Sequence, residues 1–472
     1  MSLPPLGVFA AHASASAPDP HPGASPTMHL GRGPHRLPRS ADATQSSCRQ
    51  LPICYPYGKT GSRERQRGTI GRHPAASPGV PGKTPPAPLP CRTGRKDAHR
   101  VMTRRIFIHK MLTWIKGASV LGFLAGKKDA MGFDARSVNQ DHSTGTTLSL
   151  RELADRKIHH GDGRFLNPFG RTVHGNLWRL LRWKFFSENR FKAHYPEEPV
   201  NHVTVDWEAV KRHRGLSVTF LKHASVLIRD RKRTILVDPV FFDLFWFIED
   251  HTPLSFPIKA MPHPHHVLIT HGHYDHLDVR SLKALKPETH IISPLGYDDV
   301  FTDAGLFRRT SLDWFDAFDE DGLCVTLLPA NHWTMRNPFV GPNRALWGSY
   351  LVKTVCGPTI FISGDTAYFE GFREIGKTFH IDLAILCLGA YEPRWFMKGS
   401  HMNQKEAVRA FRELGAKKLM IVHWGTFRLG DEPVHFPPLD LARELEIQGI
   451  PDRRISLAHG GTIYYNEHGE PV

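Results

Sequence analysis

Four side chains that commonly bind metal ions lie within six residues in the stretch His271-Gly-His-Tyr-Asp-His. Three imidazoles and a carboxylate at this spacing are not required by packing, and they are typical zinc ligands. The apolar residues 267–270 before them predict a buried strand, and residues 279–285 after them predict a short helix. The motif, which comprises His271, His273, Asp275 and His276, is therefore expected on a loop that a sheet holds in fixed geometry.

Three more candidate ligands each follow an apolar, strand-like run. His332 follows residues 325–331, Asp365 follows residues 360–364 and His423 follows residues 420–422. Each alone is also explained by a capping aspartate or a hydrogen-bonded histidine. Together with the first motif they supply five imidazoles and two carboxylates. This number suffices for two zinc ions that share one carboxylate and keep positions open for water.

Strand-like and helix-like runs alternate along the rest of the chain. Further candidate strands are residues 216–228, 234–237, 289–293, 323–328, 349–355, 359–362, 383–388 and 418–422. Candidate helices are residues 296–304, 404–414 and 439–448. This alternation is typical of a layered α/β architecture with helices outside the sheets. Cys324, Cys356 and Cys387 are expected to be small buried residues, and the absence of a Cys-x-x-Cys pair argues against a zinc ribbon or a disulfide framework.

The order of the candidate ligands resembles that of the metallo-β-lactamase fold superfamily. The resemblance implies a four-layer αββα sandwich with two zinc ions. One ion would be held by His271, His273 and His332 and the other by Asp275, His276 and His423, with Asp365 bridging. β-Lactamases of this fold carry Cys at the position of Asp365, and flavodiiron members carry Glu at the position of His273. The resemblance therefore favours a zinc hydrolase other than a β-lactamase.

Longer runs resemble one subfamily, the N-acyl-phosphatidylethanolamine-hydrolysing phospholipase D group, over residues 164–438. They are residues 220–225, Asp238-Pro239, His332-Trp333, Gly364-Asp-Thr-Ala-Tyr368, Gly389-Ala-Tyr-Glu-Pro-Arg-Trp-Phe-Met397 and residues 423–427. Two departures from the pattern are an aromatic loop after Pro239 and Ser400 before His401. The resemblance implies a phosphodiesterase that cleaves such lipids to N-acylethanolamine and phosphatidic acid.

Five residues are given roles in this reaction. Asp275 and Asp365 are expected to steer the proton of the attacking water as well as to bind metal. His401 is expected to orient a ligand or the leaving group, and Tyr274 to line the pocket. Arg394 is a candidate phosphate contact, with a salt bridge or stacking on its aromatic neighbour as the alternative.

Two aromatic stretches bear on the substrate. Residues 176–191 alternate aromatic and basic side chains, and residues 241–248 are aromatic almost throughout. Each fits a membrane surface or a domain core. If they are exposed beside the metal site they favour a phospholipid, and if they are buried they favour a small soluble ester, lactone or phosphodiester. A non-catalytic metal-binding scaffold, the third class, would not require every ligand to be intact.

The formal charge of +15 is confined to residues 1–136, whereas residues 137–472 carry equal numbers of acidic and basic side chains. A nucleic-acid partner is therefore not expected. Residues 1–101, rich in Pro, Gly and Ser, are predicted to be disordered or to precede the true start at Met102. Residues 102–136 begin with a twin-arginine-like signal over residues 102–126, which predicts an exported or membrane-associated enzyme, with an amphipathic helix of a cytoplasmic protein as the alternative. Residues 148–472 form the predicted hydrolase domain.

Overall fold

The computed structural model describes residues 148–170, 182–197, 200–337, 339–355 and 357–472. The predictions for residues 1–101 and 102–136 lie outside the described residues, as do residues 176–181 of the first aromatic stretch. In the part of the chain that is described, no helix is both long and apolar enough to cross a membrane.

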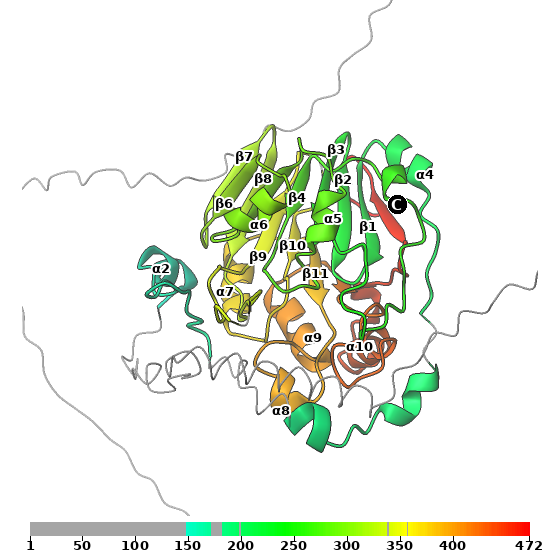
Figure 1. The fold of residues 1–472 in the computed structure, drawn as a ribbon. Helices are drawn as coiled ribbons and strands as arrows, with labels where there is room; N and C mark the ends of the chain where they lie inside the picture. Colours follow the sequence, from blue (N-terminus) through cyan, green and yellow to red (C-terminus); the bar gives the residue numbers. More distant parts are fainter. Residues whose placement is uncertain (1–147, 171–181, 198–199, 338, 356) are drawn as a thin grey trace, which may run out of the picture. The chain divides into compact units, whose positions relative to one another are not determined.

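Two seven-stranded mixed sheets form the centre of the domain (Figure 1). The first has the order β14 (Thr462–Tyr465), β1 (Leu216–Lys222), β2 (Ser225–Asp230), β3 (Arg233–Val237), β4 (His266–Leu268), β5 (His290–Pro294) and β6 (Arg309–Leu312). The second has the order β13 (Arg454–Ile455), β12 (Lys418–Val422), β11 (Leu383–Cys387), β10 (Ile360–Ile362), β9 (Ser349–Lys353), β8 (Leu323–Leu328) and β7 (Ala317–Glu320).

Strand alternation divides the apolar side chains of each sheet between two layers. Ile235 of β3 and Ile360 of β10 belong to the core between the sheets. Their neighbours Leu236 and Phe361 belong to separate outer cores. Successive side chains of a strand point to opposite faces, so both faces of these strands must be covered.

Helices supply the two outer layers. α4 (Trp207–Arg212), α5 (Val279–Lys283) and α6 (Asp298–Asp303) contribute side chains to the core outside the first sheet. α7 (Gly371–Thr378), α9 (Gln404–Glu413) and α10 (Phe436–Ile447) do so outside the second (Figure 1). The predicted four-layer αββα sandwich is therefore confirmed.

Strand direction determines where the connecting loops emerge. β3 and β4 are parallel, and β1 has the same direction because it is separated from β3 by the antiparallel β2. In the second sheet β10, β11 and β12 are parallel, and β8 shares their direction across the antiparallel β9. The loops that follow these seven strands leave the carboxyl edge of their sheets, which is where α/β proteins place their sites.

Some local predictions were wrong. Residues 216–228 form two strands, β1 and β2, that turn at His223 instead of one strand. Strands β6, β7, β13 and β14 were not predicted, and neither were the helices α2 (Leu150–Asp155), α4, α7 and α8 (Arg394–Met397). Cys324 and Cys387 are buried, as expected, and Cys387 is a free thiol, but Cys324 is disulfide-bonded. The prediction for Cys356 lies outside the described residues.

Candidate metal centre

The predicted ligands come from loops at the carboxyl edges of the two sheets. His271 lies three residues beyond β4 and the other three residues of the first motif follow it. His332, Asp365 and His423 lie just beyond β8, β10 and β12, respectively. Ligands that are far apart in the chain therefore converge where the two sheets face each other.

One group of ligand atoms surrounds His273. Its Nδ1 lies 2.9 Å from His271 Nε2 and 3.3 Å from His332 Nε2. Asp365 Oδ2 lies 3.8 Å from His271 Nε2 and 3.9 Å from His332 Nε2. Three imidazole nitrogens and one carboxylate oxygen form a set of the size that one zinc ion takes.

A second group lies on the other side of Asp365. Its Oδ1 is 3.3 Å from His276 Nε2 and 3.3 Å from His423 Nε2. Asp275 Oδ2 completes the group at 3.2 Å from His423 Nε2 and 3.7 Å from His276 Nε2. The two oxygens of Asp365 thus face two different groups, which is the arrangement of a carboxylate that bridges two metal ions.

Asp238, at the end of β3, orients ligands of both groups. His276 Nδ1 donates to Asp238 Oδ2 at 2.7 Å, which leaves Nε2 directed at the second group. The Thr270 hydroxyl donates to the same carboxylate oxygen at 2.6 Å and lies 3.0 Å from His271 Nδ1. Such outer partners set the tautomer and the ring orientation of metal-binding histidines.

The backbone of these loops is constrained. Asp238 and His423 have positive φ values of 40° and 69°, which few residues other than glycine adopt. Gly364, just before Asp365, has φ of 56°, and a Cβ there would lie 2.8 Å from Cβ of Thr270. These strained positions fix the directions in which Asp365 and His423 leave their strands.

Protonation of the metal-free cluster follows from burial and neighbouring charges. Burial alone would lower the pKa of His276, but the carboxylates of Asp365, Asp275 and Asp238 raise it well above its usual value. The pKa of His423 is raised to about 9 against the effect of burial, chiefly by Asp365. Without metal, His276 and His423 are therefore both protonated at neutral pH, and bound cations would displace these two protons.

Several buried nitrogen and oxygen atoms of the candidate ligands are not satisfied by hydrogen bonds to one another. His276 Nε2 and Asp365 Oδ1 are buried and have no hydrogen-bond partner among the described residues. His271 and His332 are at most 1% exposed, and their Nε2 atoms lie 3.8 and 3.9 Å from Asp365 Oδ2, beyond hydrogen-bond distance. Unpaired buried polar groups are costly, so a cation between them is the chemistry that this donor set serves.

His223 was not predicted as a site residue. It follows β1, is fully buried, and places Nε2 3.1 Å from Asp275 Oδ2. It belongs to the second group together with Asp275, His276 and His423. Its sequence signal, a histidine just after an apolar run, is the one shared by His332 and His423. It was missed because residues 216–228 were interpreted as one continuous strand.

Tyr274 connects the metal-binding loop with the predicted aromatic loop. Its ring lies 5.3 Å from that of Phe245, and its hydroxyl donates to the carbonyl of Arg336. Phe245, Trp246, Phe247 and Tyr274 are 38%, 68%, 52% and 43% exposed. We call these four residues the aromatic rim. This stretch is exposed beside the metal-binding loop, which favours a phospholipid substrate over a small soluble one.

The other aromatic stretch gives a mixed result. Residues Arg182–Phe186 form a short π-helix in which Trp183 is buried and donates to Asp431, and Phe186 is 74% exposed. The buried tryptophan contacts Phe396, at a ring distance of 4.9 Å. This stretch is therefore partly core and partly surface.

His401 and Arg394 have different surroundings. His401 Nδ1 lies 3.9 Å from Asp365 Oδ2, and its ring is 5.4 Å from that of His332. Its side chain is 15% exposed, so it adjoins both ligand groups and remains accessible. Arg394 forms an ion pair of 2.7 Å with Glu406 and donates to the carbonyls of Tyr391 and His401. The structure thus gives Arg394 the salt bridge that was the alternative to a phosphate contact.

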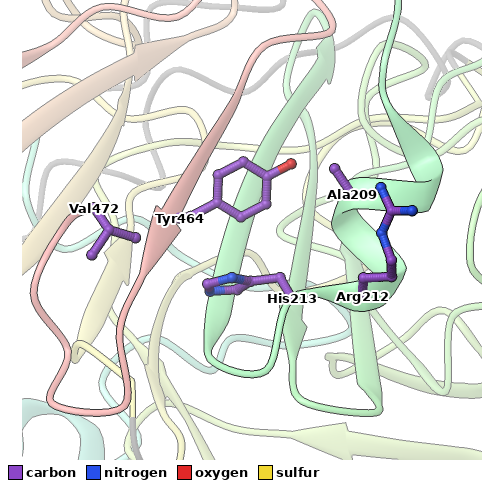
Figure 2. A pocket seen from close by; sticks show the side chains of 5 residues that line it. All are labelled: Ala209, Arg212, His213, Tyr464 and Val472. Carbon is purple, nitrogen blue, oxygen red and sulfur yellow. The ribbon is translucent and has the colours of Figure 1, made fainter.

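An open depression of about 400 Å³ lies elsewhere on the domain. It is lined by Ala209, Arg212, His213, Tyr464 and Val472 (Figure 2). The strand β14 that carries Tyr464 pairs with the beginning of β1, whereas the candidate metal ligands cluster beyond the end of β1. The depression is therefore separate from the metal centre.

Comparisons with known proteins show the family of the chain. The model of a family described as "Beta-lactamase superfamily domain" matches residues 233–424. N-acyl-phosphatidylethanolamine-hydrolyzing phospholipase D 1 of Caenorhabditis elegans is 30% identical over 317 residues, which cover 62% of this chain and 88% of that protein. The mitochondrial enzyme of the same name from Saccharomyces cerevisiae is 32% identical over 232 residues, 46% of this chain and 49% of that protein.

The chain belongs to the metallo-β-lactamase superfamily, in its N-acyl-phosphatidylethanolamine phospholipase D-like family. It is a metal-dependent hydrolase. Among solved structures, an isothiocyanate hydrolase from Delia radicum gut bacteria superposes with a TM-score of 0.45 at 18% identity, over 53% of this chain and 98% of that one.

Proposed function

We propose that this enzyme is a dinuclear zinc phosphodiesterase of the phospholipase D type. Its proposed substrates are N-acyl-phosphatidylethanolamine-type lipids, and its products N-acylethanolamine and phosphatidic acid. The observation that carries the proposal is the bridging position of Asp365 between two ligand groups. The relatives that bear the phospholipase name support the choice of substrate.

Seven residues would bind the two zinc ions. His271, His273 and His332 would hold one zinc ion, Asp275, His276 and His423 the other, and Asp365 both. Zinc bound there supplies Lewis-acid chemistry, which makes water nucleophilic near neutral pH and neutralises charge on the phosphoryl oxygens. The metal-binding loops exclude most solvent because nearly all their ligating side chains are buried. Electrostatic interactions are stronger in such a site.

In the proposed reaction the oxygen of water bonds to phosphorus and the bond from phosphorus to the ethanolamine oxygen breaks. The water loses a proton, for which Asp275 and Asp365 are the nearest carboxylates, and the leaving oxygen gains one. His401 is the accessible imidazole beside both ligand groups, so we assign to it the orientation of the phosphate or of the leaving group.

The aromatic rim supports an amphipathic substrate. Three consecutive aromatic side chains, Phe245 to Phe247, are exposed and join the metal-binding loop through Tyr274. Exposed apolar groups that gather beside a catalytic site are typical of surfaces that contact lipid. We propose that this rim contacts the acyl chains or the surface of a bilayer that contains the substrate, and that residues 102–126 direct export or membrane association.

The first experiment measures zinc content and products together. The full chain, His271→Ala and Asp365→Asn are incubated with vesicles that contain N-acyl-phosphatidylethanolamine. We expect the wild-type chain to bind at least two zinc ions, two of them at the catalytic centre, and phosphatidic acid release to be at least 100-fold slower in both variants. Undiminished turnover in either variant would exclude this site as the catalytic centre.

A second experiment separates the lipid from a small soluble substrate. Trp246→Ser combined with Phe247→Ser is compared with Phe307→Ser, which removes an aromatic side chain that is 70% exposed just before β6. We expect the double variant to lose lipid hydrolysis at least tenfold while cleaving bis(p-nitrophenyl) phosphate normally. Equal lipid hydrolysis by all three proteins would favour a small ester, lactone or phosphodiester as substrate.

A further inference from the structure

A second group of metal-binding side chains lies away from the catalytic centre. His266, His290 and Glu320 bring one ligand atom each within 4.8 Å of one another. His266 is the first residue of β4, whereas His271 lies beyond the end of the same strand. The two histidines thus lie at opposite ends of β4, and the group of His266, His290 and Glu320 is separate from the groups of the catalytic centre.

Strand register explains how these residues meet. His266 and His290 are paired residues on the parallel strands β4 and β5. Leu268 and Ile292, two residues further along each strand, belong to the core between the sheets. Alternation therefore directs both imidazoles into the same layer, at its edge.

Glu320 approaches from the opposite sheet. Along β7 the side chains alternate between exposed Ala317 and Asp319 and less exposed Phe318 and Glu320. Phe318 contacts the core, and its ring lies 5.5 Å from that of His266, in a tilted contact, and 4.9 Å from that of His290, in an edge contact. The three candidate ligands thus come from two different sheets, and an ion among them would join β4 and β5 to β7.

The hydrogen bonds within this group leave a ring nitrogen of each histidine without a partner in the described part of the chain. His266 Nε2 donates to Glu320 Oε2 at 2.7 Å, and His290 Nε2 lies 2.9 Å from Thr310 Oγ1. The Nδ1 atoms of both histidines are buried and have no hydrogen-bond partner among the described residues. His266 and His290 are 2% and 7% exposed, and the Glu320 side chain, at 32%, keeps a route to solvent.

The protonation states of the group suit a metal ion. Burial lowers the pKa of His266 to about 4 and also lowers that of His290, so both imidazoles are neutral at pH 7. Burial would raise the pKa of Glu320, but the hydrogen bond from His266 and the charge of Arg308 help to lower it overall, so it is ionised. Neutral imidazole and carboxylate are the forms that bind metal.

A second cluster of two histidines and a carboxylate, His159, His160 and Asp313, differs in one respect that disfavours metal binding. His159 and His160 meet Asp313 at 2.6 and 2.8 Å, but Lys157 Nζ also lies 2.6 Å from the carboxylate. Lys157 and His160 contact the same carboxylate oxygen, Oδ2, so a cation of the protein already lies beside that imidazole. At Glu320 the guanidinium of Arg308 binds only Oε1, at 2.7 Å, and Oε2 faces the imidazole.

We propose that His266, His290 and Glu320 form a structural site for a divalent cation of the zinc class, which fastens the edge strand β7 to the first sheet. Two imidazoles and one carboxylate are a recognised zinc ligand set, and Thr310 or water completes the shell. The site adds stability by mass action, because the cation binds the folded chain and the unfolded chain lacks the assembled ligands.

Zinc stoichiometry of the full chain tests the proposal. Metal-free wild type, Glu320→Gln and His290→Gln are dialysed against zinc and analysed by elemental mass spectrometry, with His380→Gln as the control. His380 is an exposed histidine whose Nε2 lies 3.0 Å from the carboxylate of Asp382. The control therefore removes a histidine–carboxylate pair that is not part of the proposed metal site. We expect wild type and control to bind one more equivalent than the other two variants, and phosphodiester hydrolysis to be unchanged in all four.

Thermal unfolding supplies the second readout. Zinc is expected to raise the midpoint of unfolding more in the wild type than in Glu320→Gln, whose partly exposed side chain can be changed without disturbing the core. Equal zinc content and equal zinc-induced shifts in the wild type and Glu320→Gln would overturn the proposal. That result would leave the catalytic assignment standing, because activity and the catalytic zinc ions are measured in the same samples.

Discussion

His223 contacts the same carboxylate oxygen of Asp275 as His423 does, at 3.1 and 3.2 Å, and the two imidazole rings lie 4.2 Å apart. Its backbone also accepts the N–H of His423 at 2.7 Å, so one residue orients two candidate ligands of the second group. Removing a partner of this kind lowers metal affinity by roughly 10–100-fold in known sites.

We therefore expect His223→Gln to bind one of two zinc ions 10–100-fold more weakly and to leave the group around His273 unchanged. Competition with a chromophoric chelator measures both affinities. His213→Gln is the matched control, because this histidine follows α4, before β1 begins, and contacts the carbonyl of Tyr465. Two unaltered zinc affinities in His223→Gln would show that this histidine has no part in the centre.

Arg394 is expected to act through protein contacts. Its guanidinium bonds Glu406 and the carbonyls of Tyr391 and His401, and the capping box of α9 uses the same glutamate. Arg394→Met should reduce the free energy of unfolding by about 2–3 kcal/mol, since it removes hydrogen bonds to a charged group.

A double-mutant cycle in urea distinguishes this role from a phosphate contact. If Arg394 acts through Glu406, the loss in the Arg394→Met and Glu406→Gln double variant is smaller than the sum of the single losses. A raised KM for a soluble phosphodiester in Arg394→Met, with unchanged stability, would instead assign the arginine to the substrate.

At the scale of elements, buried Glu432 fixes the loop between β11 and α8 (Arg394–Met397). Its carboxylate accepts the N–H groups of Tyr391 and Glu392 at 3.1 and 3.0 Å. Burial raises the pKa of Glu432 to about 7, although these hydrogen bonds lower it. The residue therefore retains its proton in the folded chain over a pH range in which it is ionised in the unfolded chain.

This difference predicts a pH-dependent stability. The folded pKa lies above the unfolded value, so the contribution of Glu432 is greatest below about pH 4.5 and falls as pH rises to about 7. The slope is at most about 1.4 kcal/mol per pH unit. The stability of the wild type relative to Glu432→Gln, measured by urea unfolding from pH 5 to 8, should decline up to pH 7 and then level off. A difference that stays constant or increases would contradict the raised pKa.

For the whole molecule, the candidate metal centre lies between the two sheets. His271 and His276 follow a strand of the first sheet, and Asp365 and His423 follow strands of the second. Without cations, buried donors and charges face one another across this junction. Metal binding should therefore stabilise the entire sandwich in addition to enabling catalysis.

We expect chelation to lower the unfolding midpoint as well as the activity, and added zinc to restore both. A ligand at 100 times its Kd contributes about 2.7 kcal/mol per site, so the shift should amount to several degrees. Scanning calorimetry with and without chelator measures it, and Asp365→Asn, which loses the bridging carboxylate, should respond much less. A wild-type midpoint that is insensitive to chelation would show that the sandwich does not depend on metal.

Most of the architecture could be predicted from the sequence because strand and helix periodicities are local. β8 and β12 have the predicted bounds, and α9 differs by a single residue. The predicted ligands share one local signal, a metal-binding side chain just after an apolar strand. Strands that end at a common sheet edge bring such residues together, and the structure places all seven in adjoining groups.

Features that depend on contacts between distant segments of the chain could be seen only in the tertiary structure. It revealed the turn at His223, because no glycine or proline marks that hairpin and its imidazole is held by Asp275, 52 residues away. It also paired Arg394 with Glu406, exposed the aromatic rim and set His266 and His290 opposite Glu320. Periodicity tells which face a side chain takes along its own strand or helix. The partner that it meets there depends on how two sheets are stacked, which is a property of the whole chain.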